Sequence, residues 1–240
     1  MLMPEGQEMA LGLQAYNEIF EEESESQNLP LTQLVKRVGQ GIAKIAERPD
    51  FDWEFRLIDS PQQNAFCLPG GKVAVYSGIL PVCENEAGLA VVMAHEVAHA
   101  LARHGGERMS QTMIQSGAQD IIGRIAQAQV PDKADRLMQA YGVVSEYGVM
   151  LPYNRKQESE ADHIGVMLMA QAGYDPNEAP DFWKRFGAMG GDKPSEFMST
   201  HPSDQRRAAD LLALMGEAEQ HYSSAPQKFG RGQTITRTTG

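Results

Sequence analysis

The feature that most constrains this chain is a long proline-free segment, residues 86–113, whose apolar residues repeat at helical intervals. Asn85 stands directly before it and is a favourable helix N-cap residue. Apolar residues, mainly alanine and valine, occupy all faces of the first half of this segment. A helix that is apolar all round is normally buried. Gly105 and Gly106 predict a weak point or bend within this helix. The sequence therefore predicts one long helix, buried over its first half.

Three polar side chains, His95, Glu96 and His99, interrupt this apolar helix. Residues four apart on a helix project from the same face, so the two imidazoles can hold one metal ion. Neutral imidazoles suit Zn²⁺, and the carboxylate of Glu96 can take a proton from a water activated by the metal. H-E-x-x-H also arises by chance, but buried polar groups need partners, and a metal with a water supplies them. We therefore predict a catalytic zinc site with Glu96 as the general base.

A catalytic zinc has three protein ligands and one open position, so a third ligand must come from elsewhere in the chain. Gly105 stands where the extended H-E-x-x-H-x-x-G-x-x-H motif needs a histidine, and His104 is expected at the surface because it faces another side of the helix. The best candidate is Glu158, with Asp162 four residues later on the same helical face. Asp162 would accept the second ring N–H of a liganding histidine. The alternative for this pair is a solvated acidic helix start.

The composition is that of an ordinary globular chain, with 240 residues of which 42% are hydrophobic and 22% charged. A formal net charge of -11 argues against nucleic acid as a partner. The longest apolar run, residues 87–102, is too short and too polar at its centre to span a membrane. No secretory signal is visible, and removal of a leader or lipid anchor is left open. Cys67 and Cys83 are expected in the core, with a single bridge between them left open.

The rest of the pattern predicts an α+β fold that is mainly helical. Two helices are expected between residues 5 and 47. Strand-like runs at 53–58, 65–68 and 72–76, with a reversal at Pro69-Gly70-Gly71, indicate a small sheet with a hairpin. Further helices are expected in these places: before Pro131, over 132–149, over 159–172, over 177–189, and from Ser203 onward. We divide the chain into N-terminal helices (1–50), a catalytic domain (51–222) and a flexible tail (223–240).

Four motifs occur in the order that one known family shows. They are Asn64-Ala65-Phe66 with Pro69-Gly70-Gly71, H-E-x-x-H at 95–99, R-x-x-E-x-x-A-D at 155–162, and Thr200-His201-Pro202 with Arg207. Over residues 5–215 the chain resembles the gluzincin family of zinc metallopeptidases that includes the CAAX prenyl endopeptidase, the HtpX-type peptidases and soluble periplasmic relatives. Asn154 and Cys67 depart from the usual pattern, which commonly has Ser and a small residue there. Since no membrane span or helical repeat domain is visible, we expect the minimal soluble type.

The resemblance implies a zincin-like domain in which a small sheet and hairpin pack on the H-E-x-x-H helix. It also implies that Glu158 is the third zinc ligand, that His201 lies over the metal, and that Arg207 braces this region. His201 would either stabilise the oxyanion of the tetrahedral intermediate or cap the zinc when no substrate is bound. Without the resemblance, His201 reads only as a loop residue before a proline.

We therefore expect a zinc-dependent endopeptidase that hydrolyses unfolded or extended polypeptides. Substrate would add as an extended strand to an open edge presented by residues 72–77, and the predicted substrate-binding residues are Asn64, Ala65, Val73, Ala74 and Val75. The resemblance places the activity in protein quality control in the bacterial periplasm or envelope. Two rivals are a zinc-stabilised, chaperone-like binding module without turnover and another zinc hydrolase such as an esterase. Peripheral or lipid-anchored membrane association and the oligomeric state are left open.

Overall fold

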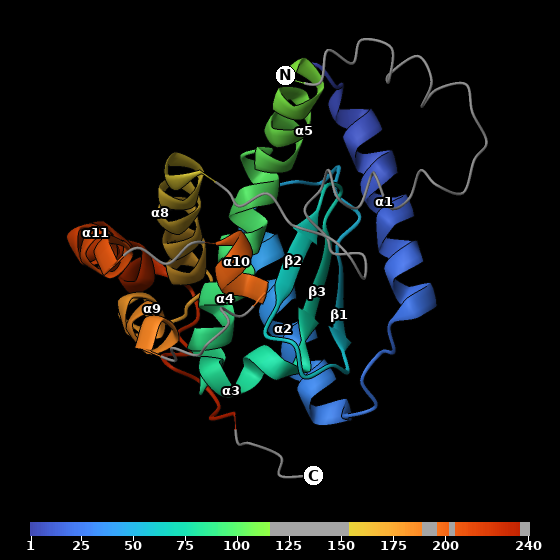
Figure 1. Ribbon diagram of the computed structural model, residues 1–240. Coiled ribbons are helices and arrows are strands. Elements are labelled where there is room, and N and C mark those ends of the chain that lie inside the picture. The colour runs from blue at the N-terminus through green and yellow to red at the C-terminus, as the bar shows by residue number, and fades with distance from the viewer. Residues whose placement is uncertain (116–153, 189–195, 202–204, 236–240) are drawn as a thin grey trace.

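Helix α4, Glu86–Leu101, lies at the centre of the fold, and every residue from Glu86 to Ala100 is buried. The Asn85 side chain caps this helix by accepting a hydrogen bond from the backbone N–H of Gly88 at 3.0 Å. Helix α2, Leu29–Ile45, and helix α8, Arg155–Gln171, pack against α4 (Figure 1). The burial expected from its apolar surface is therefore confirmed.

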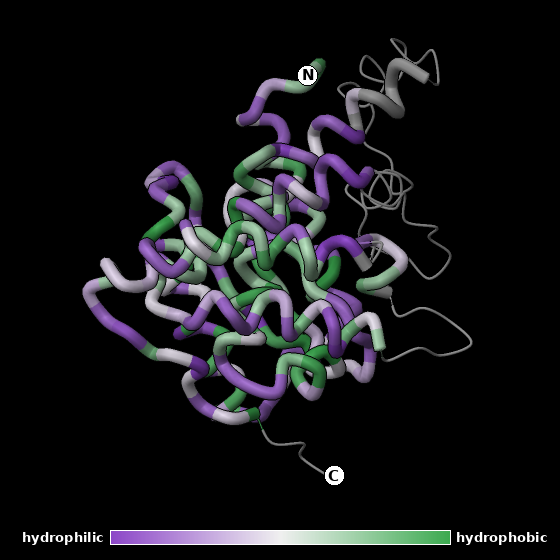
Figure 2. The backbone as a smooth tube through the Cα atoms, turned by 90° about the vertical axis from the view of Figure 1, so that its left-hand side faces the viewer, coloured by the Kyte–Doolittle hydropathy of each residue, from purple (hydrophilic) through white to green (hydrophobic). Residues whose placement is uncertain are grey.

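The computed structural model describes residues 1–115, 154–188, 196–201 and 205–235. The helices expected before Pro131 and over 132–149 lie outside the described residues, as do the expected connection at 190–194 and the expected helix start at Ser203. Within the described part of the chain, hydrophobic segments gather at the centre and hydrophilic ones lie outside (Figure 2). No helix in that part is long and apolar enough to span a membrane.

The predicted single helix over 86–113 is wrong in one respect, because the chain leaves the helical path at Arg103. Helix α4 ends at Leu101, Arg103 adopts a left-handed conformation with φ of 56°, and helix α5, His104–Gln115, begins at the next residue. The Arg103 guanidinium donates to the buried carboxylate of Glu8 at 2.7 Å and to the Met3 carbonyl at 3.2 Å. The N-terminal segment of the chain therefore stabilises the break, and Gly106 leaves room for it, because a Cβ atom there would overlap the Glu8 carboxylate.

The sheet formed by the described residues has the strand order β1-β3-β2. Strand β1, Glu54–Ile58, runs parallel to β3, Lys72–Tyr76, and β2, Ala65–Leu68, runs antiparallel to β3 with Ala65 opposite Val75. The predicted small sheet and hairpin are confirmed. The prediction that 72–77 presents an open edge is wrong, because β3 is paired on both sides. The strand next to α4 is β2 (Figure 1), and no strand among the described residues pairs with its other side.

The two N-terminal helices cover the sheet, as the helical spacing of their apolar residues predicts. Helix α1, Glu5–Glu22, packs Tyr16 and Ile19 in a small core with Ile58, Phe66 and Ala74. Helix α2 contributes to the main core, in which its apolar face meets β1 and α4. A short 3₁₀ helix, η1 (Ser77–Ile79), and helix α3, Leu80–Cys83, lead from the sheet into α4.

The second half of the fold is helical and packs on the other side of α4 (Figure 1). Asn154 caps α8 with a capping box, and the helix ends before Gly173, whose φ is 92°. Helices α9 (Glu178–Ala188), α10 (Glu196–Thr200) and α11 (Gln205–Ser224) follow. The prediction of a mainly helical α+β fold is therefore confirmed.

Residues 225–235, which the sequence assigns to a flexible tail, are instead packed against the start of α4. The backbone N–H groups of Glu86 and Ala87 donate to the carbonyls of Gln233 and Arg231, at 2.9 and 3.1 Å. Ile235 is buried in the main core. This tail satisfies two amides that the first turn of a helix cannot pair internally.

Candidate metal centre

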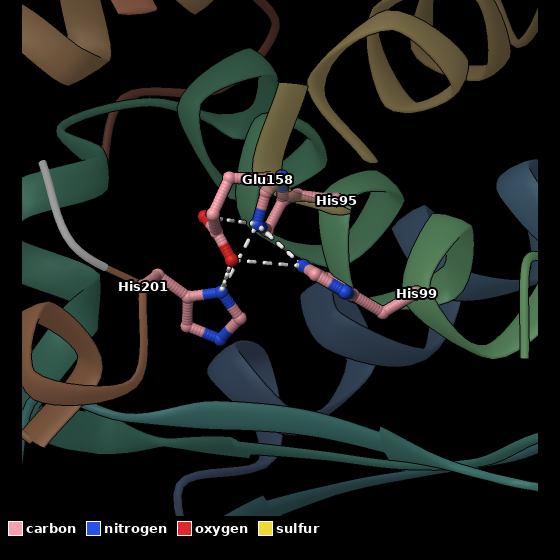
Figure 3. Close-up of side chains that lie close together, drawn as sticks. All are labelled: His95, His99, Glu158 and His201. Atoms are coloured by element: carbon pink, nitrogen blue, oxygen red, sulfur yellow. Dashed lines mark hydrogen bonds and ion pairs between the residues drawn. The ribbon is translucent and has the colours of Figure 1, made fainter. Parts of the chain in front are cut away.

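Four buried side chains from three parts of the chain point toward one another beside α4 (Figure 3). His95 and His99 come from α4, Glu158 from the first turn of α8, and His201 from the residue after α10. Each offers one ligand atom, and these atoms all lie within 4.8 Å of one another. The structure therefore brings together the three predicted zinc ligands and the histidine predicted to lie over the metal.

Five separations among these atoms, measured to one or the other Glu158 oxygen, are close to those around a tetrahedral zinc ion. His95 Nε2 lies 3.1 Å from His99 Nε2, 3.2 Å from His201 Nδ1 and 3.5 Å from Glu158 Oε2. Glu158 Oε1 lies 3.0 Å from His201 Nδ1 and 3.4 Å from His99 Nε2. Zinc–nitrogen distances of about 2.0–2.1 Å with tetrahedral angles place ligand atoms about 3.3 Å apart. Imidazole and carboxylate are also the donor types that zinc accepts.

Two carboxylates are buried beside the ligand nitrogens. Glu158 Oε2 lies 2.7 Å from Arg207 Nη1 and Glu96 Oε1 lies 3.2 Å from His201 Nε2, so each has a basic group opposite it, although neither contact has the geometry of a hydrogen bond. Three imidazoles and the Glu158 carboxylate gather within 4.8 Å of one another, and these are donor types that zinc accepts. The residues present therefore fit a metal ion.

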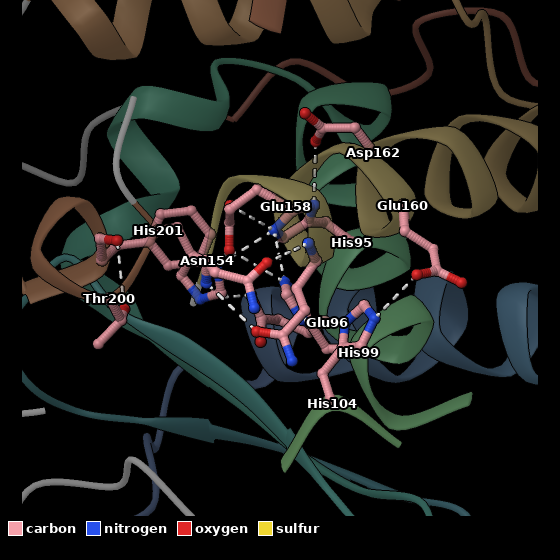
Figure 4. Close-up of polar contacts among 12 residues, drawn as sticks. His95, Glu96, His99, His104, Asn154, Glu158, Glu160, Asp162, Thr200 and His201 are labelled. Atoms are coloured by element: carbon pink, nitrogen blue, oxygen red, sulfur yellow. Dashed lines mark hydrogen bonds and ion pairs between the residues drawn. The ribbon is translucent and has the colours of Figure 1, made fainter. Parts of the chain in front are cut away.

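Asp162 contacts the ligand His95 (Figure 4), and Arg207 contacts both Asp162 and Glu158. Asp162 Oδ1 lies 3.0 Å from His95 Nδ1, on the ring edge opposite the ligand atom. Arg207 donates two hydrogen bonds to Asp162, at 2.7 and 2.6 Å, and its Nη1 lies 2.7 Å from Glu158 Oε2. The Arg207 guanidinium also lies 3.5 Å above the Trp183 ring. Arg207 thus contacts the proposed ligand Glu158, the His95 partner Asp162 and the Trp183 ring.

Burial and charge shift the pKa values of these groups in opposite directions. Burial alone lowers the pKa of His95, but hydrogen bonds to Asp162 and Glu158 raise it to about 9 in the metal-free protein. Burial lowers the pKa of His99 well below its usual range. Burial raises the pKa of Glu96, although His201 and His95 nearby oppose this. The site can therefore hold charged and neutral groups side by side.

The predicted substrate-binding residues divide into two groups. Asn64 and Ala65 lie at the start of β2, the strand beside α4, and both are buried. Val73, Ala74 and Val75 are fully buried in the central strand β3, so a peptide cannot pair with them as a new strand. Their assignment was wrong because strand order depends on pairing between distant segments, which a local pattern does not reveal.

His104 is a site residue that sequence reasoning missed. It was expected at the surface, yet it is 2% exposed, and its Nδ1 lies 2.9 Å from His99 Nδ1. Its Nε2 lies 3.4 Å from Glu160 Oε2 on α8 (Figure 4). The expectation assumed an unbroken helix. In such a helix, a residue five positions after His99 lies on a different face from His99. The left-handed Arg103 turns the chain and redirects His104.

The central H-E-x-x-H helix, the carboxylate from a second helix and the small adjoining sheet define a zincin-type metallopeptidase domain. A family model described as Peptidase family M48 matches residues 31–215. The chain therefore belongs to peptidase family M48, a family of zinc metallopeptidases. The predicted family is confirmed.

Curated relatives agree with this family. The chain is 42% identical over 192 residues to the mitochondrial metalloendopeptidase OMA1 of Schizosaccharomyces pombe, covering 79% of this chain and 55% of that protein. It is 31% identical to the same enzyme of Saccharomyces cerevisiae, covering 91% of this chain and 66% of that protein. It is 30% identical to the beta-barrel assembly-enhancing protease of Escherichia coli, covering 75% of this chain and 38% of that protein. The chain thus spans about half the length of the relative from Schizosaccharomyces pombe.

Proposed function

We propose that this chain is a zinc-dependent endopeptidase whose metal is held by His95, His99 and Glu158. The observation that carries the proposal is the buried cluster itself, in which one ligand atom from each of the three residues and from His201 lies within 4.8 Å of the others. Three protein ligands leave one position for catalysis. His201 Nδ1 lies 3.2 Å from His95 Nε2 and 3.0 Å from Glu158 Oε1, so it could fill that position, which supports a capping role for His201 when no substrate is bound.

Zinc bound at this site would polarise the scissile carbonyl and lower the pKa of a water. Glu96, next to His95 on α4, takes the proton from the attacking water and delivers it to the nitrogen of the leaving amine. Its burial raises its pKa, which suits a group that must both accept and return a proton. His201 Nε2 lies 3.2 Å from Glu96 Oε1, so a shift of His201 on substrate entry frees the carboxylate for the water.

The outer edge of β2, where no strand pairs among the described residues, is the surface that supports peptide binding. An extended peptide can add to residues 65–68 through backbone hydrogen bonds, and only unfolded or extended segments offer such a strand. A pocket of about 420 Å³ between α8 and α11 has Glu158 and Asp162 in its wall, together with Arg155, Arg206 and Leu211. Among the proposed ligands Glu158 lines this pocket, and it does so on the side of the cluster where Asp162 and Arg207 lie.

The cellular role that we propose is protein quality control in the bacterial envelope. The name of the Escherichia coli relative refers to the assembly of β-barrels, which are proteins of the bacterial outer membrane. Two other relatives are named as mitochondrial enzymes. The compartment in which this chain acts is therefore tested separately. Fractionation of the source cells, with detection of the chain outside the cytoplasm, checks this assignment.

Digestion of an unfolded protein such as casein tests the enzymatic proposal. Glu96→Gln should abolish cleavage and retain zinc, because the amide cannot accept the proton from water while the three ligands are intact. Wild-type protein that binds zinc and unfolded chains without cleaving them would instead support a chaperone-like module. Cleavage of ester substrates alone would support a different zinc hydrolase.

Zinc content tests the ligand assignment separately. Glu158→Ala should lose most of the bound metal, because it removes one of three protein ligands. Glu160→Ala is the matched control, since it removes the same charge from the same helix at a half-exposed position. Equal zinc content in the two variants would contradict Glu158 as a ligand.

A further inference from the structure

The turn between α4 and α5 places the side chain of His104 against the proposed ligand His99. Arg103 is held in its left-handed conformation by the buried Glu8 carboxylate. His104, the first residue of α5, is thereby packed with its ring edge-on to the ring of His99, at 4.9 Å between centroids and an angle of 71°. The facing atoms are the two Nδ1 nitrogens, 2.9 Å apart.

Metal binding by His99 determines where the ring protons lie in this pair. His99 Nε2 faces the ligand cluster, so a metal needs its lone pair and the ring proton must lie on Nδ1. That N–H then points at His104 Nδ1, which must accept the hydrogen bond and carry its own proton on Nε2. His104 Nε2 in turn lies 3.4 Å from Glu160 Oε2, a carboxylate that accepts. The chain of contacts has one consistent assignment of protons.

We propose that His104 is a positioning residue of the metal centre, which accepts the Nδ1 hydrogen of His99 and so keeps the His99 lone pair directed at the metal. The inference rests on the proposed zinc site. Glu160 orients His104 from the edge of α8. The two histidine ligands from α4 then have different supports, a charged carboxylate for His95 and a neutral imidazole for His99.

The charges around the cluster explain why His99 has a neutral partner. Glu96, Glu158 and Asp162 are already buried within this cluster, and Arg207 is the cation in contact with two of them. A further buried carboxylate beside His99 would have to be desolvated against these negative charges. An imidazole supplies the required acceptor without adding a charge. Its other nitrogen, Nε2, contacts Glu160, which is half-exposed.

Two substitutions of His104 separate the contact with His99 from the contact with Glu160. The terminal atoms of asparagine reach about as far as Nδ1 of histidine, so His104→Asn keeps an acceptor facing His99. The longer glutamine reaches the position of Nε2, so His104→Gln keeps the contact with Glu160 and loses the acceptor opposite His99. His104→Ala removes both contacts. His163→Gln, at an exposed histidine of α8, is the matched control.

The measurement is the zinc dissociation constant of the full chain, obtained by competition with a chromophoric chelator. Loss of the partner of a metal-bound histidine typically weakens binding by about 10- to 100-fold, and we expect this for His104→Gln and His104→Ala. His104→Asn should stay within about threefold of wild type, and His163→Gln should be unchanged, because neither removes the acceptor. The absorption spectrum of the cobalt-substituted protein should shift in the same two variants, since the ring of His99 is reoriented.

Melting of the chelator-treated variants shows which of them fold, and the comparison is made among those. Wild-type affinity in both His104→Gln and His104→Ala would overturn the inference, as would an equal loss in His104→Asn and His104→Gln. A wild-type chain that binds no zinc would instead refute the proposed metal site itself. Failure of the positioning role and failure of the zinc site are therefore distinguishable.

Discussion

Helices α4 and α8 approach each other closely at Gly165, and a methyl group added there tests whether this contact sets the metal site. A Cβ atom at position 165 would lie 3.1 Å from the backbone nitrogen of His95 and 3.2 Å from its Cα and from the carbonyl carbon of Ala94. These are backbone atoms of a buried helix, so they cannot swing aside as a side chain can. Gly165→Ala must therefore move α8 away from α4 by a few tenths of an ångström.

The expected change in the free energy of unfolding is the difference between an overpacking cost and a gain in helix propensity. Overpacking of a well-packed core typically costs about 1–3 kcal/mol. Replacing glycine by alanine inside a helix gains about 1 kcal/mol of helix propensity. We therefore expect Gly165→Ala to lower the free energy of unfolding by about 1 kcal/mol. Because Glu158 lies on α8 and His95 on α4, and metal sites tolerate about 0.2 Å of displacement, we also expect zinc binding to weaken about tenfold.

Urea unfolding of the metal-free protein measures the first effect, and chelator competition measures the second. Gly41→Ala is the matched control, because Gly41 also lies within a helix, α2, and no described atom lies within 4 Å of the added Cβ. This control should be more stable than wild type by about 0.5–1 kcal/mol with unchanged zinc affinity. The reasoning would be refuted if Gly165→Ala proved as stable as Gly41→Ala and bound zinc as tightly.

Two further predictions concern pH and the C-terminal tail. Because the pKa of His95 is raised to about 9 in the metal-free protein, zinc must displace a proton below that pH. Zinc affinity should therefore rise about tenfold per pH unit between pH 7 and 8, measured by chelator competition, and a flat profile would contradict this. Ile235→Ala should lower the free energy of unfolding by about 2 kcal/mol in urea, because Ile235 is buried in the main core. An unchanged midpoint would show that the tail is not anchored there.

The parts of the site that the sequence predicted lie within single helices. His95, Glu96 and His99 share one helix, and Glu158 and Asp162 share another. Their spacing follows from the helical repeat, which is set by local backbone geometry and is the same in any surroundings. The apolar surface around the first set also predicted that α4 is buried. These inferences needed no knowledge of how the helices pack.

The errors concern contacts between distant parts of the chain. His104 was placed at the surface because the break at Arg103 depends on Glu8, a partner 95 residues earlier. Residues 73–75 were assigned to a free edge because the parallel pairing of β1 with β3 leaves no pattern in the sequence of β3 alone. The tail was expected to be flexible because its polar composition does not show that its carbonyls meet the first turn of α4.

The sequence by itself determined the chemistry that we propose for this protein, because the residue types and helical spacings of the proposed metal ligands and of Glu96 are local properties. The tertiary structure decided which ligand gains a carboxylate partner and which an imidazole partner, which strand offers its edge, and where His201 stands. Those outcomes depend on contacts that Asp162, His104 and β2 make with α4 from separate segments of the chain. Such contacts arise from the packing of the whole core, in which each segment constrains the others.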